Sequence, residues 1–187
     1  MSETISREIH LKSRAVGMPT EDNFELREAI IPELEGGELL VRNIYMSVDP
    51  YMRGRMADRE SYISPFQVGK PLEGGSVGTV IESRHPEFIE GDYVLSMYGW
   101  REYFVSNGSG LSKIDPSLAP IQAYLGIMGM PGMTAYIGLL EMGKPEKGET
   151  VFVSAAAGAV GSAVCQIAKI KGCTVIGSAG SDEKALS

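Results

Sequence analysis

The chain has 187 residues, of which 43% are hydrophobic and 22% charged, which is enough apolar material for a packed core and excludes a wholly disordered chain. Its net charge of −7 and the absence of a Lys/Arg cluster exclude a sequence-independent nucleic-acid binder, which needs a basic face. At about 150 residues per domain, the length allows one domain and part of a second.

The N-terminus does not have the pattern of a secretory leader. Residues 1–14 are charged from Glu3 onward and contain no long apolar run. The two cysteines, Cys165 and Cys173, lie outside any CxxC pattern and cannot form a disulfide framework. Buried, reduced thiols fit a cytosolic protein, so we expect a cytoplasmic location.

Up to about residue 115 the sequence has the pattern of short β-strands. The segments alternate in part and are separated by turns rich in Gly, Pro and Asp. The expected strands are Ile5–Leu11, Phe24–Ile30, Glu38–Val48, Gly78–Ser83, Asp92–Met97 and Glu102–Val105. Many short strands with glycine-rich turns predict a small barrel or a sandwich.

Near Pro116 the pattern becomes helical. Asp115-Pro116-Ser117 is typical of a helix start, and residues 117–140 carry no charged side chain over a length that can cross a bilayer. Two prolines and four glycines interrupt this stretch. We therefore expect two short buried helices, broken at Pro131, in place of a membrane span.

A β-α-β pattern closes the sequence. The expected elements are a strand at Glu149–Ser154, a helix at Gly158–Lys171 that Gly172 ends, a strand at Thr174–Gly177, and a helix start at Ser181. A doubly wound domain takes on the order of 100 residues or more. This stretch would be only its beginning, so we expect a truncated or naturally split chain.

The strongest chemical signal is the turn between the first of these strands and its helix. Ala156, Gly158 and Gly161 fit a dinucleotide fingerprint of the form A-x-G-x-x-G. Small residues let the strand turn sharply and let the backbone approach a pyrophosphate, which the helix N-terminus attracts. A plain small-residue turn is the alternative, but the flanking strands and helix favour nucleotide binding.

The end of the second strand bears on the choice of nucleotide. NAD-binding folds usually carry an acidic residue there for the ribose hydroxyls, and Ser178-Ala179 supplies none. A 2′-phosphate would not be repelled, and Lys184 is close enough in sequence to reach it. A solvated helix lysine is the alternative for Lys184, and spacing alone does not decide between the two.

Three motifs occur together and in order along the chain. They are VDPYMR (48–53), MGMPGMTAYIGLLE (128–141), and AAAGAVG (155–161) followed by IAKIKGCTVIGSAGSDEK (167–184). With them the chain resembles the zinc-independent medium-chain dehydrogenases/reductases, in the branch of prostaglandin reductases, leukotriene B4 dehydrogenases and plant double-bond reductases. The resemblance covers essentially the whole chain. It implies a mixed α and β fold, with a GroES-like β-barrel over residues 1–120 and the beginning of a Rossmann NADP-binding domain over residues 121–187.

The resemblance also implies an activity and a site. The activity is reduction, by NADPH, of the carbon–carbon double bond of α,β-unsaturated aldehydes or ketones. The glycine turn would hold the pyrophosphate, a lysine the 2′-phosphate and a threonine the nicotinamide, while the barrel would supply an active-site tyrosine. The residues carried over are the cofactor contacts Gly158, Ala159, Val160, Gly161, Lys184 and Thr134, and the catalytic Tyr51. Taken alone, Tyr51 follows an ordinary Asp-Pro turn, where packing is the commoner role.

No metal is expected. Zinc alcohol dehydrogenases of the wider family use Cys and His ligands, and the corresponding stretches here, Val48–Tyr51, Leu72-Glu73 and Met130, offer neither. His10 and His85 fit no ligand spacing, and we expect both to be solvated.

Three functions stay open at this point. The favoured one is an enal or enone reductase represented by an N-terminal fragment that is inactive alone, and the others are an NADPH-dependent quinone reductase and a non-catalytic binding module. The expected partners are a small-molecule enone or enal and a second copy of the complete protein in a homodimer, with no nucleic acid and no membrane.

Overall fold

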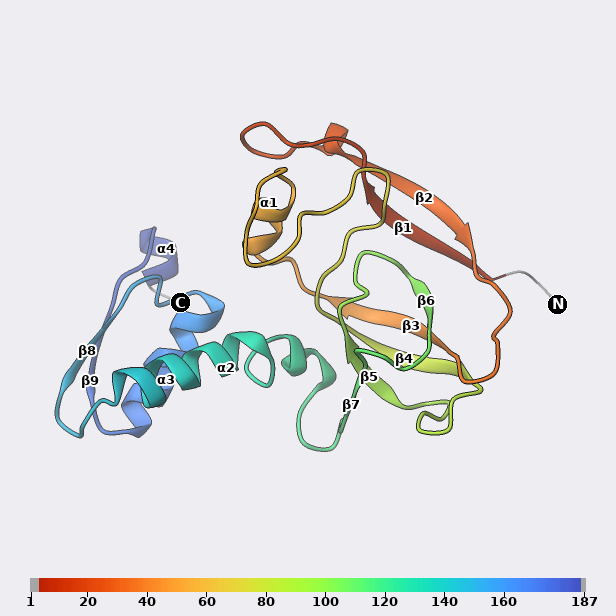
Figure 1. The fold of residues 1–187 in the computed structure, drawn as a ribbon. Coiled ribbons are helices and arrows are strands. Elements are labelled where there is room, and N and C mark those ends of the chain that lie inside the picture. The colour runs from red at the N-terminus through yellow and green to blue at the C-terminus, as the bar shows by residue number, and fades with distance from the viewer. Residues whose placement is uncertain (1–3, 186–187) are drawn as a thin grey trace. The chain divides into compact units, whose positions relative to one another are not determined.

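The computed structural model describes residues 4–185, and the chain divides into two compact units, residues 1–121 and 122–187 (Figure 1). The first unit is built mainly of strands, and the second contains helices and one parallel pair of strands. Within the described residues, no helix has the length and apolar character needed to cross a membrane.

Two antiparallel sheets make up the first unit. Its strands are β1 (Ile5–Leu11), β2 (Phe24–Ile30), β3 (Leu39–Met46), β4 (Ser76–Ser83), β5 (Tyr93–Ser96), β6 (Tyr103–Ser106) and β7 (Ser112–Ile114), and its helices are η1 (Glu21–Asn23) and α1 (Tyr51–Arg55). β1 pairs with β2, and the other strands form one sheet in the order β6-β3-β4-β5-β7. Six of these strands overlap predicted segments, and β7 was not predicted.

The predicted barrel is not closed. β6 and β7 are the two ends of the five-stranded sheet, and each is only three or four residues long. All three residues of β7 pair with β5, and nothing in the described part of the chain pairs with its other side. β1 instead lies beside the start of β6, where the Ile9 N–H donates to Trp100 O at 2.8 Å and the Glu102 N–H donates to Arg7 O at 3.0 Å.

Two apolar clusters hold the first unit together. One packs the sheet through Leu39, Val41, Val80, Phe88, Val94 and Phe104. The other joins α1 to β1 through Leu11, Met52, Met56, Phe66 and Leu72. Met52 and Met56 are almost fully buried, and burying a side chain of this size contributes about 1.5–3 kcal/mol. These two side chains therefore anchor α1 and fix the position of Tyr51 at its first residue.

A βαβ arrangement organises the second unit. Its elements are η2 (Ile121–Leu125), which begins at the boundary, α2 (Met130–Tyr136), the π-helix η3 (Ile137–Gly143), β8 (Thr150–Val153), α3 (Ala159–Ile170), β9 (Thr174–Gly177) and α4 (Asp182–Ala185). β8 and β9 pair in parallel, and α3 connects them. α2 and η3 pack on α3, with Leu139, Ala168 and Cys173 at the centre of the core.

The helices before β8 differ from the prediction. Residues 115–117 form a turn, closed by the Ser117 N–H donating to Asp115 Oδ1 at 2.8 Å, and no helix starts there. Pro131 lies in the first turn of α2, where its missing N–H breaks no intrahelical bond, so it begins a helix instead of ending one. The expected burial is also wrong for this stretch, since Met130 and Met133 are 76% and 57% exposed.

Candidate functional site

The turn between β8 and α3 is packed closely at its glycine positions. A Cβ atom at Gly161 would lie 2.2 Å from Ala155 O, and one at Gly158 would lie 3.1 Å from the same oxygen. On the other side, a Cβ at Gly177 of β9 would lie 2.6 Å from Ala156 Cβ. The backbone of the turn therefore fits between the start of α3 and the end of β9 only because glycines stand on both sides.

Hydrogen bonds fix this turn to both strands. The Ala156 N–H donates to Ser178 O, and the Ser178 N–H donates to Val153 O, each at 2.9 Å. Ala155 has a φ of 49°, in the left-handed region that residues other than glycine rarely adopt. Such a conformation persists only where the surroundings hold it, so the turn is a fixed shape.

The first turn of α3 offers unpaired backbone donors. Gly158 is the N-cap residue, and no side chain caps the helix there. In an α-helix the first N–H groups, here those of Ala159, Val160 and Gly161, have no acceptor within the helix. Ala159 and Val160 are exposed, and the helix starts at the carboxyl end of β8. These donors and the helix dipole suit an anion such as a pyrophosphate.

Lys184 and Thr134 belong to the same unit as the turn. Lys184 lies in the short helix α4, where its backbone N–H donates to Ser181 Oγ at 3.4 Å, and its side chain is exposed. Thr134 lies on α2, and its hydroxyl donates to Met130 O at 2.8 Å, which leaves the oxygen lone pairs able to accept. The acid-free end of β9 at Ser178-Ala179 lies beside the turn, through the bond from Ala156.

Tyr51 lies in the first unit, at the start of α1. It packs against the apolar cluster that contains Met52 and Met56. It also lines a cavity of about 330 Å³, whose other lining residues are Pro50, Arg53, Gly54, Arg55, Arg59, Ser61, Tyr62, Ile63 and Pro65. Burial raises the pKa of the Tyr51 phenol, and the Asp49 carboxylate adds to the rise. The hydroxyl therefore keeps its proton at neutral pH and can act as a hydrogen-bond donor.

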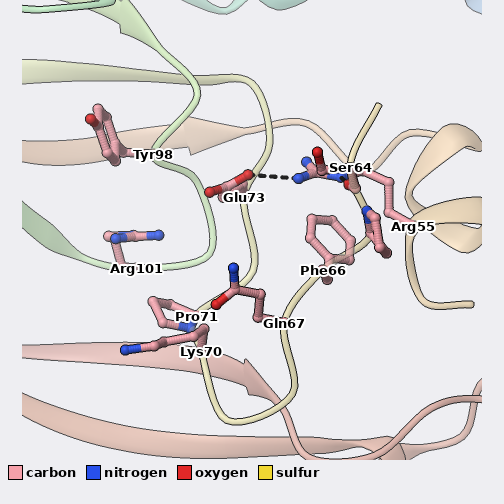
Figure 2. Close-up of a pocket in the computed structure, with 10 residues that line it drawn as sticks. Arg55, Ser64, Phe66, Gln67, Lys70, Pro71, Glu73, Tyr98 and Arg101 are labelled. Carbon is pink, nitrogen blue, oxygen red and sulfur yellow. Dashed lines mark hydrogen bonds and ion pairs between the residues drawn. The ribbon is translucent and has the colours of Figure 1, made fainter. Parts of the chain in front are cut away.

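Arg55 was not singled out from the sequence, yet it is the most buried Arg, Lys, Asp or Glu side chain among the described residues of the first unit. Figure 2 shows its guanidinium reaching Glu73, at 2.7 Å, in a neighbouring cavity of about 370 Å³. Its Nε also donates to Ser64 O at 2.8 Å, and its Cζ lies 4.1 Å from the centre of the Phe66 ring. Arg55 lines both cavities and so forms part of the wall between them. The one sequence signal that could have identified Arg55 is its position two residues after the VDPYMR motif (48–53).

The histidines do not form a metal site. Among residues 4–185, no group of three or more His, Cys, Asp or Glu side chains is placed to hold a metal ion. His10 is not solvated as expected, because its ring nitrogens lie 3.1 Å from Gly69 O and 2.9 Å from Glu8 Oε2 and the residue is buried. His85 is half-buried, with its Nδ1 accepting from the Glu87 N–H at 3.1 Å. The expected lack of bound zinc stays a prediction.

Comparison with known proteins identifies the class. Residues 7–114 match the family model described as the N-terminal domain of oxidoreductase. The chain belongs to this oxidoreductase family.

The relatives define the branch more closely. The chain is 47% identical to an NADPH-dependent curcumin reductase of Escherichia coli and to an NADP⁺-dependent 2-alkenal reductase of Nicotiana tabacum, over 93% and 98% of its length. It is 46% identical to mouse prostaglandin reductase 1 over 93% of its length. The chain spans 50%, 55% and 52% of these three relatives. The chain therefore corresponds to the N-terminal half of the medium-chain reductases of this branch, which confirms the family resemblance inferred from the sequence motifs.

A solved structure supports the same placement. The chain superposes on CurA from Vibrio vulnificus, solved in complex with NADPH, with a TM-score of 0.89 and 48% sequence identity. The match covers 95% of this chain and 52% of CurA. The coarse fold, a mixed α and β N-terminal oxidoreductase domain followed by a βαβ unit, is therefore shared.

Proposed function

We propose that this chain supplies the N-terminal part of an NADPH-dependent reductase that acts on the carbon–carbon double bond of α,β-unsaturated aldehydes and ketones. Residues 1–120 would be the substrate domain, and residues 121–187 the start of a Rossmann NADP-binding domain. The observation that carries the proposal is the glycine turn, where a Cβ at Gly161 would meet Ala155 O at 2.2 Å. The names of the alkenal, curcumin and prostaglandin reductases, which are its relatives, support the same reaction class.

The residues of the turn fit the pyrophosphate of a dinucleotide. A backbone without side chains at Gly158 and Gly161 allows close approach, and the N–H groups of Ala159, Val160 and Gly161 would donate to phosphate oxygens. When bound, NADPH supplies the hydride. Thr134 would accept a hydrogen bond from the nicotinamide carboxamide, and Lys184 would neutralise the 2′-phosphate that an acid at the end of β9 would repel.

Tyr51 would act on the substrate. Reduction of an enone or enal at its β-carbon places negative charge on the carbonyl oxygen, and a phenol that keeps its proton can donate a hydrogen bond to that oxygen. The raised pKa of Tyr51 supports this role, since the donor form persists across the neutral pH range. Stabilising charge that develops only in the transition state lowers the barrier without tightening substrate binding.

The test is cofactor choice in the protein that carries this sequence. NADPH and NADH are titrated while nucleotide fluorescence is followed, and then a 2-alkenal or a quinone is added and nucleotide oxidation is measured. Lys184→Ala should weaken NADPH binding roughly ten- to a hundredfold, the value of a charge-assisted phosphate contact, and leave NADH binding nearly unchanged. Lys169→Ala, at an exposed lysine in the last turn of α3, is the matched control and should change neither.

Three results would count against the proposal. Equal losses of NADPH and NADH affinity in Lys184→Ala would remove the phosphate role of that lysine. Turnover of the quinone without turnover of the 2-alkenal would favour the quinone reductase alternative. Steady oxidation of NADH in preference to NADPH would contradict the cofactor.

A further inference from the structure

Trp100, in the connection between β5 and β6, is held in its place at two energetic costs. Its φ of 64° lies in the left-handed region, which is an outlier for a bulky side chain. Its indole nitrogen is buried, and this N–H has no hydrogen-bond partner among the described residues. A strained backbone and a buried donor without an acceptor each destabilise the folded chain. Strained conformations of this kind concentrate at functional sites, so Trp100 calls for a functional explanation.

Hydrogen bonds from two other strands fix the backbone on both sides of Trp100. The Asn43 side chain of β3 donates from Nδ2 to Tyr98 O and to Arg101 O, each at 2.8 Å. The Ile9 N–H of β1 donates to Trp100 O, also at 2.8 Å. Because these bonds hold the chain before, at and after Trp100, the left-handed conformation is imposed by β1 and β3 and cannot relax locally.

The indole of Trp100 and the side chain of Met52 meet above Gly74. A Cβ at Gly74 would lie 3.4 Å from Trp100 Nε1 and 2.3 Å from Met52 Cε. The Gly99 N–H donates to Gly74 O at 3.0 Å, which holds the backbone next to Trp100 against this glycine. Met52 belongs to the apolar cluster that joins α1 to β1, and Trp100 packs against that cluster. Gly74 and Trp100 therefore bound the space that the Met52 methyl group fills.

Met52 connects this contact to Tyr51. Met52 is 2% exposed, and its backbone N–H donates to Asp49 O at 3.1 Å. Its sulfur accepts from the Asp49 N–H at 3.5 Å. Tyr51 lies between these two residues in the sequence, begins α1 and packs against the same apolar cluster. A shift of the Met52 side chain therefore moves the turn that carries the Tyr51 phenol.

We propose that Trp100 is a positioning residue for Tyr51, because its indole, fixed at Gly74 by the strained backbone, keeps Met52 in place and so fixes the first turn of α1. Trp100 acts through Met52 and is not itself a catalytic residue. The inference rests on the proposed function, in which the Tyr51 hydroxyl donates to the carbonyl oxygen of the substrate. Such a donor has to be held within about 0.5 Å of its productive position, so a small movement of α1 lowers the rate.

The first experiment is a double-mutant cycle in the protein that carries this sequence. Trp100→Phe keeps an aromatic ring but gives Met52 room to move, and it should lower kcat for a 2-alkenal about tenfold with the Kd of NADPH unchanged. In the Tyr51→Phe background the same change should lower kcat less than about twofold, because the hydroxyl that Trp100 positions is gone. The control is Phe104→Leu, in the other apolar cluster, which should lower the urea midpoint and leave kcat unchanged in both backgrounds.

The second experiment reports the surroundings of Tyr51 without turnover. The tyrosines are replaced by fluorotyrosine, the Tyr51 resonance is identified by its loss in Tyr51→Phe, and its titration with pH is followed by fluorine NMR. Burial raises the pKa of Tyr51. The resonance should therefore titrate at a lower pH in Trp100→Phe, where α1 is less tightly held, and at an unchanged pH in Phe104→Leu.

Equal losses of kcat in the two backgrounds, or an unchanged titration of Tyr51 in Trp100→Phe, would overturn the inference and leave Trp100 with a packing role only. If Trp100→Phe does not fold, Met52→Leu tests the same contacts at nearly constant volume, and the same two results would overturn the inference. A protein that reduces the 2-alkenal but shows either result keeps the proposed function and loses only this inference. A protein that does not reduce the 2-alkenal loses the proposed function, and the titration of Tyr51 then decides the positioning role.

Discussion

Replacing Gly161 by Ala tests whether the turn at the start of α3 must be free of side chains. The added methyl group would lie 2.2 Å from Ala155 O and 2.9 Å from both Ala155 C and Ala156 Cα. All three contacts are backbone atoms, so the turn has to move as a unit by about 1 Å, and such overpacking costs about 1–3 kcal/mol. Alanine returns about 1 kcal/mol through its higher helix propensity, so we expect a net loss of up to about 2 kcal/mol.

Two other glycines of the same unit supply a graded comparison. A Cβ at Gly158 would lie 3.1 Å from Ala155 O, which requires a shift of only a few tenths of an ångström, whereas one at Gly138 would meet no atom within 4 Å. Gly138→Ala should therefore stabilise the unit slightly, by about 0.5–1 kcal/mol, because it removes conformational freedom from the unfolded chain. The expected order of stability is Gly138→Ala, then Gly158→Ala, then Gly161→Ala.

The assay is urea unfolding of the 187-residue chain followed by far-ultraviolet circular dichroism, together with NADPH affinity in the protein that carries this sequence. Trp100, the one tryptophan of the chain, belongs to the first unit, so its fluorescence transition is an internal control that should not move. NADPH affinity should fall in Gly161→Ala, because the turn and its donors are displaced together. The reasoning is refuted if Gly161→Ala unfolds at the same urea concentration as Gly138→Ala and binds NADPH as the unmodified protein does.

Three further predictions concern Tyr51, Arg55 and metal. Tyr51→Phe should raise the activation barrier for enone reduction by about 1–3 kcal/mol with NADPH binding intact, and an unchanged rate would make Tyr51 a packing residue. Because burial raises the pKa of Tyr51, the rate of the unmodified protein should stay level through neutral pH and fall only at a pH above the range in which an ordinary tyrosine loses its proton. Arg55→Gln removes the pair with Glu73 and the stacking on Phe66 and should lower the free energy of unfolding by about 1–3 kcal/mol, whereas Arg27→Gln, in an exposed pair, should leave the urea midpoint nearly unchanged. Elemental analysis should find no stoichiometric zinc, and one tightly bound zinc per chain would contradict this.

The strands that were predicted well are those whose pattern is local. β1 and β2 have the predicted bounds, and each is a seven-residue segment in which apolar and polar residues alternate in part. β7 was missed because Ser112–Ile114 is too short to alternate, and it becomes a strand only by pairing with β5. The open barrel has the same origin, since strand composition does not determine which edges meet.

For the site residues too, those with a signal in neighbouring positions were predicted, and those whose partners are distant in the sequence were not. The glycine turn was predictable because close backbone packing requires small residues at a fixed spacing, and these residues lie near one another in the sequence. His10 was misjudged because its partner Gly69 is 59 residues away, so nothing near it in the sequence indicated burial. Arg55 was missed for the same reason, because its partner Glu73 is 18 residues away and only the folded chain brings the two side chains together.

The π-helix η3 (Ile137–Gly143) affects how gaps in alignments of related sequences should be interpreted. A π-helix has wider turns than an α-helix, with bonds from residue i to i+5, and is most simply derived from one by inserting a residue. Deleting one residue between 137 and 143 should therefore restore ordinary α-helical turns without breaking the helix. A single-residue gap at this place in an alignment would mark a change of helix type, not a change of loop length.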